Sequence, residues 1–280
     1  MLRKVSVLAA ALMLVAAPAF ASGGAEHPRE IEFSFDGPFG KYDQAQLQRG
    51  YKVYREVCSA CHSMSLLSFR NLGDKGGPFY DPKYKTSNDN AVVKTIAADY
   101  QIPDIDSETG DPIQRPGTPA DRFPSPFPNE AAARASNGGA LPPDLSLIAK
   151  ARHGGPAYVY SILTGFVNPP AGLNVPVGRY YNPYMAGDVS SAWTGDPHHV
   201  PPGGFIAMPP PLADGKVTFD DGSPSTLDQQ AKDVSAFLMW AAEPKMEDRK
   251  QMGFAVLIYL VLFAGLLYAS YRRVWRNESH

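Results

Sequence analysis

Two cysteines and a histidine stand together at Cys58-Ser59-Ala60-Cys61-His62, and the chain has no other cysteine. A Cys-x-x-Cys-His string is typical of covalent attachment of a c-type haem. The two thiols can add to the two vinyl groups of the porphyrin, and the adjacent histidine can bind the iron. We therefore predict one covalent haem c on Cys58 and Cys61, with His62 as the proximal ligand of the iron.

Two other kinds of site use closely spaced cysteines. A thioredoxin-like redox pair has the same spacing, but it is expected beside a βαβ pattern and gives His62 no function. A structural zinc site usually has four ligands, whereas Cys58, Cys61 and His62 supply three, two of them adjacent in the chain. Haem attachment accounts for all three side chains, so we favour it.

The ligand on the other face of the haem bears on function, because methionine there favours electron transfer and an open position favours gas binding or catalysis. Among the eight methionines, Met185 and Met208 are the candidates. Met208 precedes three prolines, which stiffen the loop and can hold a weakly bound sulfur in place. Met185 is less constrained, and core packing is the ordinary use of either methionine. The other possible ligands are His153, His198 and His199.

The N-terminus has the pattern of a secretory signal peptide. A basic start and an apolar stretch of 13 residues at 5–17 precede an A-x-A cleavage pattern that ends at Ala21. Thirteen residues are too few to cross a hydrocarbon core of ~30 Å. We expect residues 1–21 to be a signal peptide and residues 22–248 to form an exported haem domain.

A second hydrophobic segment lies near the C-terminus, where residues 251–271 carry no charge. A spanning helix needs ~20 such residues, and a buried core helix is usually shorter. Basic residues flank the segment on both sides, and aromatic residues lie near its C-terminal end. We predict a transmembrane helix over 249–272, in contact with membrane lipid, and a cytoplasmic tail over 273–280. With the signal peptide, this gives a single-pass protein of the inner (cytoplasmic) membrane, with its haem domain in the periplasm.

The charge of the chain differs between its parts. Without the signal peptide and the residues from Arg249 onward, 19 basic and 27 acidic residues remain, a net charge of about −8. Such a domain can steer a basic partner toward itself, although ordinary solubility calls for a similar charge. The densest acidic run lies between Asp99 and Asp111. Binding of nucleic acid is not expected.

The predicted elements are mainly helices. A capping pattern at Asp43 and Gln46 begins a helix over 41–62, in which Gly50 is expected where another helix crosses closely. The crossing partner is predicted over 227–242, after a capping pattern at Thr226 and Gln229, and a further helix over 149–164. Proline-rich loops separate them, and strand signals are weak apart from 217–219. The predicted fold class is therefore mainly α: a c-type cytochrome haem domain with long loops and one C-terminal transmembrane helix.

Over nearly its whole mature length the chain resembles the cytochrome c1 family, the haem subunits of the cytochrome bc1 complex. The segments that carry the resemblance include Gly50-Tyr51-Lys52-Val53-Tyr54, Gly139-Ala140-Leu141-Pro142-Pro143-Asp144-Leu145-Ser146, Ala151-Arg152-His153-Gly154-Gly155, Tyr181-Asn182-Pro183-Tyr184, Met208-Pro209-Pro210 and Phe237-Leu238-Met239-Trp240-Ala241-Ala242-Glu243-Pro244.

The resemblance implies roles for single residues. Met208 corresponds to the family's methionine ligand, and Arg152 to an arginine beside a haem propionate, a charge-assisted pair. Pro143 and Tyr158 align with positions that line the haem. One departure from the family pattern is an insertion at 185–204, which leaves Met185 as an alternative ligand. Another is the lack of the extra cysteines that some bacterial relatives have.

The function implied by the resemblance is the relay of one electron in a respiratory chain. The electron comes from the Rieske iron–sulfur protein and goes to a cytochrome c, and the transmembrane helix packs on cytochrome b. On its own the subunit would be a non-catalytic part of ubiquinol–cytochrome c reductase. The alternatives are a membrane-anchored c-type cytochrome of another respiratory complex and a haem enzyme with an open iron site.

Overall fold

The structure is a computed structural model, and it describes residues 24–277. The expected signal peptide at 1–21 lies outside the described residues. The described part is mainly helical, which confirms the predicted fold class. Its α-helices are α2 (Gln44–Glu56), α3 (Ala91–Ala98), α4 (Glu130–Ser136), α5 (Ile148–Ala151), α6 (Gly155–Thr164), α7 (Leu227–Ala242) and α8 (Met246–Val274). Its strands are β1 (Gln101–Ile105), β2 (Pro112–Pro116), β3 (Tyr180–Asn182) and β4 (Gly204–Ile206), and short 3₁₀ turns occur at Cys58–Ala60, Phe69–Gly73, Ser87–Asp89, Ser190–Ala192 and Trp275–Asn277.

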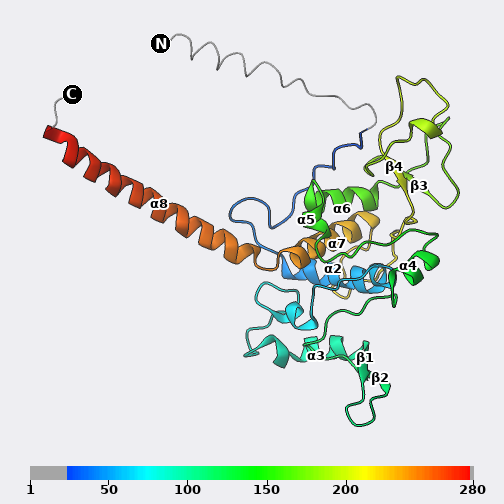
Figure 1. Cartoon of the computed structure of the whole chain (residues 1–280), viewed down its shortest axis with the longest axis horizontal. Coiled ribbons are helices and arrows are strands. Elements are labelled where there is room, and N and C mark those ends of the chain that lie inside the picture. Colours follow the sequence, from blue (N-terminus) through cyan, green and yellow to red (C-terminus); the bar gives the residue numbers. More distant parts are fainter. Residues whose placement is uncertain (1–23, 278–280) are drawn as a thin grey trace.

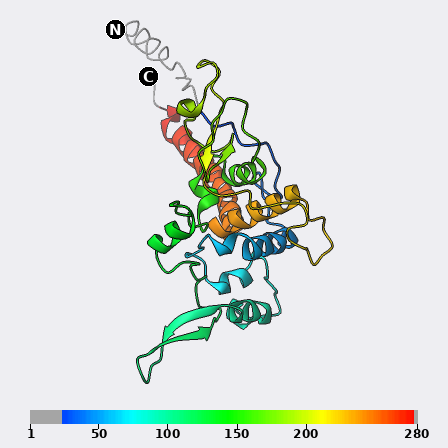
Figure 2. The same cartoon turned by 90° about the vertical axis from the view of Figure 1, so that its right-hand side faces the viewer.

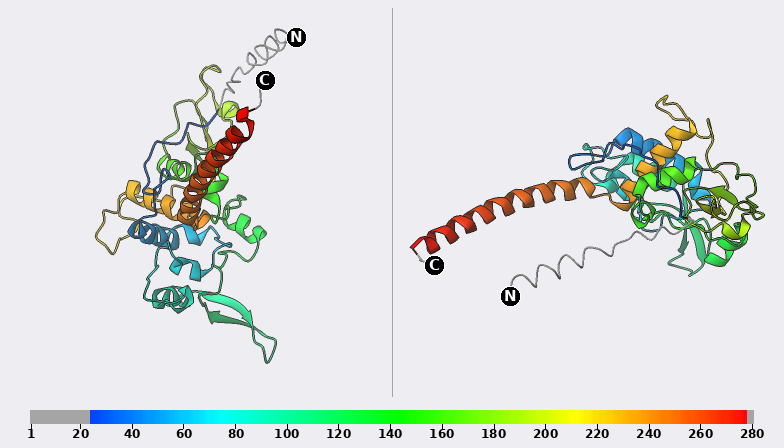
Figure 3. Two further views of the ribbon diagram at one scale, coloured as in Figure 1. Left: turned by 90° about the vertical axis from the view of Figure 1, so that its left-hand side faces the viewer. Right: turned by 90° about the horizontal axis from the view of Figure 1, so that it is seen from above.

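Helices α2 and α7 cross at the centre of the domain, and α5 and α6 pack against α7 (Figures 1 and 2). The antiparallel hairpin of β1 and β2 projects from one end of the domain. The short antiparallel pair of β3 and β4 belongs to a lobe at the other end. Helix α8 extends away from the domain as a single long rod (Figure 3).

The starts of the two central helices follow the predicted capping patterns. The Asp43 carboxylate accepts a hydrogen bond from the Gln46 backbone N–H at 3.0 Å, and the Thr226 hydroxyl accepts one from the Gln229 N–H at 3.1 Å. Each cap satisfies an N–H group that has no partner inside the helix. Both caps and the start of α7 are therefore confirmed, whereas α2 begins at Gln44, three residues after the predicted start at 41.

Gly50 lies where α2 meets α7, as the sequence predicts. A Cβ atom at this position would lie 2.1 Å from the carbonyl oxygen of Asp233 and 2.7 Å from the Cβ of Phe237. No side chain fits at such distances, because non-bonded carbon atoms are normally 3.5–4 Å apart. Glycine thus allows the two helix backbones to approach each other closely.

An aromatic cluster fills the core beside this crossing. The ring of Phe237 lies 5.7 Å from that of Tyr51 and 5.8 Å from that of Tyr54. Phe123 lies 6.1 Å from Tyr54 in an edge-to-face arrangement. Such pairs contribute about 0.5–1.5 kcal/mol beyond the burial of their area. They fix the C-terminal half of α2, and with it the residues that follow.

The predicted helix over 41–62 is wrong in its last residues, because α2 ends at Glu56. The backbone N–H of Val57 already bonds to the carbonyl groups of Val53 and Tyr54, and the Ser59 hydroxyl donates to the carbonyl of Arg55 at 2.6 Å. A serine side chain that takes up a helical carbonyl offers the backbone an alternative to another helical turn. The Cys-x-x-Cys-His segment is consequently a 3₁₀ turn outside the helix.

The predicted helix over 149–164 is interrupted. The structure has two helices, α5 and α6, with Gly154 between them at φ 87°. This left-handed conformation strains any other residue, and a Cβ here would lie 2.6 Å from the Cγ of Pro28. The break leaves Arg152 and His153 in a turn between the helices rather than inside one.

The strands do not lie where the sequence pattern predicts a strand. Residues 217–219 form no strand; Val217 and Phe219 are buried in the core. The β1–β2 hairpin instead lies in the proline-rich stretch, with Pro103 opposite Gln114 and Ile105 opposite Pro112. In a two-stranded ribbon both strands are edges, so a proline can lie where its missing N–H would have faced solvent.

Helix α8 follows α7 after three residues, and the junction is braced by side chains. The Tyr42 hydroxyl contacts the carbonyl oxygens of Met239 at 3.3 Å and Glu243 at 3.1 Å. The Lys150 ammonium lies 3.0 Å from the Glu243 carboxylate. Polar contacts from α5 and from the segment before α2 therefore hold the end of α7.

The long C-terminal helix has the length and composition of a membrane span. Its apolar window lies within Met246–Asn277, has a mean hydropathy of 2.3 and is 0 % buried within the chain. An apolar surface of this size is unstable in water but stable in lipid or against another membrane protein. Within residues 24–277 the chain therefore has one helix suited to span a membrane.

Candidate haem-binding site

The two thiols of the Cys-x-x-Cys-His segment are presented on a 3₁₀ turn directly after α2. The backbone N–H groups of Cys61 and His62 both donate to the carbonyl oxygen of Cys58, at 3.1 and 2.9 Å. The cysteines form no disulfide; Cys58 packs against the core and Cys61 is exposed. Burial, followed by the charge of Cys61, raises the pKa of Cys58 to about 12. A thioredoxin-like pair needs a thiol with a lowered pKa, so this environment is the opposite of a redox dithiol.

His62 is oriented by one hydrogen bond. Its Nδ1 lies 2.8 Å from the carbonyl oxygen of Pro143. Since a carbonyl can only accept, Nδ1 carries the proton and Nε2 keeps its lone pair. Burial lowers the pKa of His62, and this outweighs the opposing effects of the Pro143 carbonyl and the charge of Asp144. The ring is thus held as the neutral tautomer that binds a metal through Nε2.

Asp144 clamps the loop of Pro143 to the segment after His62. Its carboxylate accepts hydrogen bonds from the Ser63 hydroxyl and from the N–H groups of Ser65 and Ser146, each at 2.8 Å. Partial burial alone would raise the pKa of Asp144, but the bonds from Ser146 and Ser65 bring it well below its usual range. The carboxylate is therefore ionised and holds the Pro143 carbonyl in place over His62.

Sequence reasoning missed the role of Asp144 and Ser146. The segment that contains them was used only for its resemblance to a family. A usable signal was present, because Asp-x-Ser is a pattern in which the carboxylate accepts the N–H two residues later. The distant partners, Ser63 and Ser65, could not be found from the sequence, because they are 79–81 residues away.

Arg152 and Tyr158 lie on the two sides of the turn that joins α5 and α6. Arg152 is exposed at the end of α5, and Tyr158 is half-buried in the first turns of α6. Burial raises the pKa of Tyr158, and the positive charge of Arg152 acts in the opposite direction. The Tyr158 hydroxyl also lies 3.9 Å from the Sδ of Met185.

The two candidate methionines are separated by the β3–β4 ribbon. In its register Asn182 pairs with Gly204, and Tyr180 pairs with Ile206. Because the strands are antiparallel, Met185 follows the ribbon at one end and Met208 at the other. Met208 packs against the main core cluster, which also contacts Cys58, whereas Met185 bonds to Tyr158.

The residues present fit a covalent c-type haem. Two separate thiols lie on one turn, and the neighbouring imidazole is neutral with Nε2 available. Among the described residues no group of three or more His, Cys, Asp or Glu side chains could hold a metal ion by themselves. A porphyrin supplies the four equatorial ligands of its own iron, so this site needs only axial ligands from the chain.

Similarity to known proteins shows the family of the chain. The model of the Cytochrome C1 family matches residues 33–278. The chain belongs to the cytochrome c1 family. It is 40 % identical to cytochrome c1 of Rhodospirillum rubrum, over 99 % of this chain and 98 % of the relative. It is 42 % identical to cytochrome c1 of Blastochloris viridis, over 98 % of this chain and 96 % of the relative. A protein named cytochrome b/c1 from Bradyrhizobium diazoefficiens is 46 % identical over 98 % of this chain, which spans only 40 % of that relative.

Membership of the cytochrome c1 family gives the chain its function. Cytochrome c1 is the haem electron-transfer subunit of the cytochrome bc1 complex and carries one covalent c-type haem. The predicted cofactor and electron-transfer function are therefore confirmed.

Proposed function

We propose that Cys58 and Cys61 hold the haem covalently, that His62 binds the iron on one side, and that Met208 binds it on the other. The observation that carries this proposal is the hydrogen bond from His62 Nδ1 to Pro143, which leaves Nε2 for the metal. The bound haem supplies a one-electron Fe(III)/Fe(II) couple. The chain contributes the axial ligands and the surrounding apolar packing, which set the potential of that couple.

Arg152 and Tyr158 are proposed to bind the propionate edge of the haem. A guanidinium and a phenol can both donate to a carboxylate, and the ionic bond is the stronger one. The exposed position of Arg152 suits a group at the edge of a haem. Pro143 has a double role in this proposal: its ring lines the haem, and its carbonyl orients His62.

We propose that the chain accepts an electron from the Rieske iron–sulfur protein and passes it to a cytochrome c. It makes and breaks no bond in a substrate, so it is a non-catalytic redox subunit on its own. The name of the Bradyrhizobium relative, cytochrome b/c1, supports cytochrome b as the membrane partner. The exposed apolar surface of α8 supplies a face on which such a partner can pack.

The haem domain is proposed to lie in the periplasm, with residues after α8 in the cytoplasm. The signal pattern at 1–21 and the single span support this orientation. It is consistent with haem attachment outside the cytoplasm.

The deciding experiment is extraction of the intact protein from its own membrane in mild detergent. We expect the chain to co-purify with a b-type haem and an iron–sulfur subunit, and to be reduced when a quinol is added. Recovery of the chain with another set of redox subunits, or reduction that needs no partner, would contradict the proposal.

A further inference from the structure

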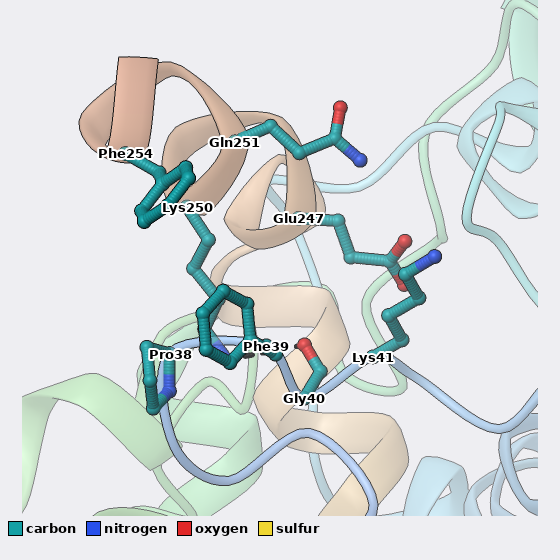
Figure 4. A pocket seen from close by; sticks show the side chains of 8 residues that line it. All are labelled: Pro38, Phe39, Gly40, Lys41, Glu247, Lys250, Gln251 and Phe254. Carbon is teal, nitrogen blue, oxygen red and sulfur yellow. Dashed lines mark hydrogen bonds between the residues drawn. The ribbon is translucent and has the colours of Figure 1, made fainter. Parts of the chain in front are cut away.

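A small pocket lies where the haem domain meets the membrane helix, away from the candidate haem site. Its volume is about 200 Å³, and it is formed between the loop before α2 and the first turns of α8. Figure 4 shows the residues that line it: Pro38, Phe39, Gly40, Lys41, Glu247, Lys250, Gln251 and Phe254.

The loop that forms one wall is fixed to the helix. The Lys250 ammonium donates to the carbonyl oxygens of Phe35 at 2.6 Å and Gly40 at 3.2 Å. The turn itself is closed by a bond from the Phe33 N–H to the Asp36 carboxylate at 2.7 Å. The wall is therefore built into the fold and is not a passing contact.

Two aromatic rings form an apolar side of the pocket. The ring centroids of Phe39 and Phe254 lie 5.8 Å apart in an edge-to-face arrangement. The two residues come from distant parts of the chain. Phe39 is 74 % exposed and Phe254 is 52 % exposed. Aromatic side chains are enriched at the boundary between a membrane and water, where their rings lie at the level of the headgroups.

The polar side of the pocket is basic. It has two lysines, the exposed Lys41 and the half-buried Lys250, and one carboxylate, that of Glu247. The Glu247 carboxylate accepts a hydrogen bond from the Tyr42 N–H at 3.0 Å. Figure 4 shows the ends of Lys41 and Glu247 on the same side of the pocket. With two positive charges and one negative charge, the pocket as a whole favours a singly charged anion.

The depth of the pocket in the membrane follows from the sequence. Lys250 is the last charged residue before the uncharged segment at 251–271. Phe254 lies about one helical turn, or ~5 Å, further in. The headgroup region of one leaflet is also about 5–7 Å thick. If residues 251–271 fill the hydrocarbon core, Lys250 and Phe254 lie at the outer and inner edges of the headgroup layer.

We propose that this pocket binds one membrane phospholipid. Its phosphodiester lies beside Lys41 and Lys250, and an acyl chain passes along Phe39 and Phe254 into the bilayer. A pocket of about 200 Å³ suits a headgroup better than a protein segment. The mixed basic and aromatic lining also matches a lipid headgroup and its chain more closely than an apolar helix of a partner.

The test uses the full chain in its own membrane, with a photoreactive benzoylphenylalanine in place of Phe39. After irradiation, the adducts are identified by mass spectrometry. A phospholipid adduct at position 39 is expected, in higher yield than at Val177, an exposed position in the lobe of β3 and β4. An adduct to another polypeptide, or a lipid yield no higher than at Val177, would overturn the proposal.

Two further arms separate the sources of the phosphate. Lys41→Gln should lower the lipid adduct at position 39 about five-fold, since one lysine near an anionic group contributes roughly that factor. The matched control, Lys85→Gln, removes an exposed lysine outside the pocket and should leave the yield unchanged. Excess glycerophosphoglycerol, a headgroup without acyl chains, should not compete. If it abolished the adduct, a free phosphodiester rather than a lipid would be the ligand.

Discussion

Arg49 on α2 donates from Nε to the carboxylate of Asp233 on α7 at 2.7 Å, and the Asp233 side chain is fully buried. The side-chain amides of Gln46 and Gln229 also donate to this carboxylate, at 3.1 and 2.9 Å. A buried carboxylate with several donors is costly to remove, because its donors lose their shared acceptor; Arg49 then keeps one other carboxylate, the partly exposed Asp221, at 2.7 Å. The crossing of α2 and α7 therefore depends on this one acidic side chain.

Asp233→Ala should lower the free energy of unfolding by about 3 kcal/mol, because the donors from Gln46, Arg49 and Gln229 lose their buried acceptor. Asp220→Ala is the matched control: Asp220 pairs with Lys52 at 2.7 Å but is 86 % exposed, and its loss should cost about 0.5 kcal/mol or less. Denaturant unfolding of the haem-loaded protein measures both. Equal losses in the two variants would show that the buried carboxylate is not a special contact.

Gly50→Ala should destabilise the same crossing by a different route. The new methyl group collides with the backbone of Asp233, so the helices must move apart, at a cost of about 1–3 kcal/mol. Gly253→Ala in α8 adds the same methyl group where nothing lies within 4 Å. Helix propensity then predicts no loss of stability. Thermal unfolding of both variants, followed by haem absorbance, compares them directly.

Met208→Leu should keep the covalent haem but remove its second axial ligand. We expect a lower redox potential, loss of the methionine-to-iron charge-transfer band and binding of carbon monoxide to the reduced protein. Met185→Leu should leave these properties in place, because this sulfur accepts a bond from Tyr158 instead. The opposite result, with Met185 required and Met208 dispensable, would assign the ligand to the inserted segment.

The clamp at Asp144 gives a defined pH dependence. Its pKa lies below the ordinary value of ~3.9, so its stabilising effect is fully present above that pH and is lost as the pH falls toward the folded-state value. Asp144→Asn should reduce stability by about 1.5 kcal/mol at pH 7, and this difference from the natural chain should shrink below pH ~4. Unfolding curves at pH 7 and pH 3 test the prediction. A difference that stays constant with pH would mean that the carboxylate charge does not matter.

The acidic run between Asp99 and Asp111 is the first candidate for a surface that steers a basic cytochrome c. In the structure Asp99 pairs with Arg55 at 2.7 Å and Asp104 pairs with Arg115 at 2.5 Å, so part of its charge is compensated. Glu108 and Asp111, at the exposed tip of the β1–β2 hairpin, are the better candidates. The steering role stays a prediction, now confined to this tip.

If the tip steers a basic partner, the rate of electron transfer to a basic cytochrome c should fall as salt rises, because screening shortens the field to ~8 Å. Glu108→Gln with Asp111→Asn should flatten this dependence. The control pair, Asp188→Asn with Asp196→Asn, removes the same charge from the lobe of β3 and β4. Stopped-flow measurement across a salt series compares the salt dependence of the rate in the tip variant, the control variant and the natural chain. Equal slopes for the tip variant and the natural chain would leave the tip with a role in solubility only.

Several features were predictable because their signals are local. The caps at Asp43 and Thr226 involve residues three apart, and the membrane helix is a long run of apolar residues. Gly50 was predictable because glycine within a helix is costly and needs a reason. The haem attachment segment was recognisable from residue types and spacing alone.

Other features depend on contacts that a sequence does not display. The hairpin at 101–116 forms despite its prolines, because both strands are edges and the Arg115 guanidinium bonds to Asp104 and Asp121. The end of α2 depends on a serine side chain that competes for a helical carbonyl. The clamp at Asp144 joins segments about 80 residues apart. In each case a tertiary or side-chain contact overrode the local pattern.

The braced junction between α7 and α8 has a mechanical consequence. Only three residues join the two helices, and Tyr42, Lys150 and Lys250 hold the turn from several sides. A domain joined to its membrane helix in this way has no flexible linker, so it cannot rotate over the membrane to accept or donate its electron. The haem then stays at a fixed position relative to the membrane helix. If the donor and the acceptor are far apart, the redox domains of the partner proteins must move between them, and the linkers of those proteins must be long enough to allow it.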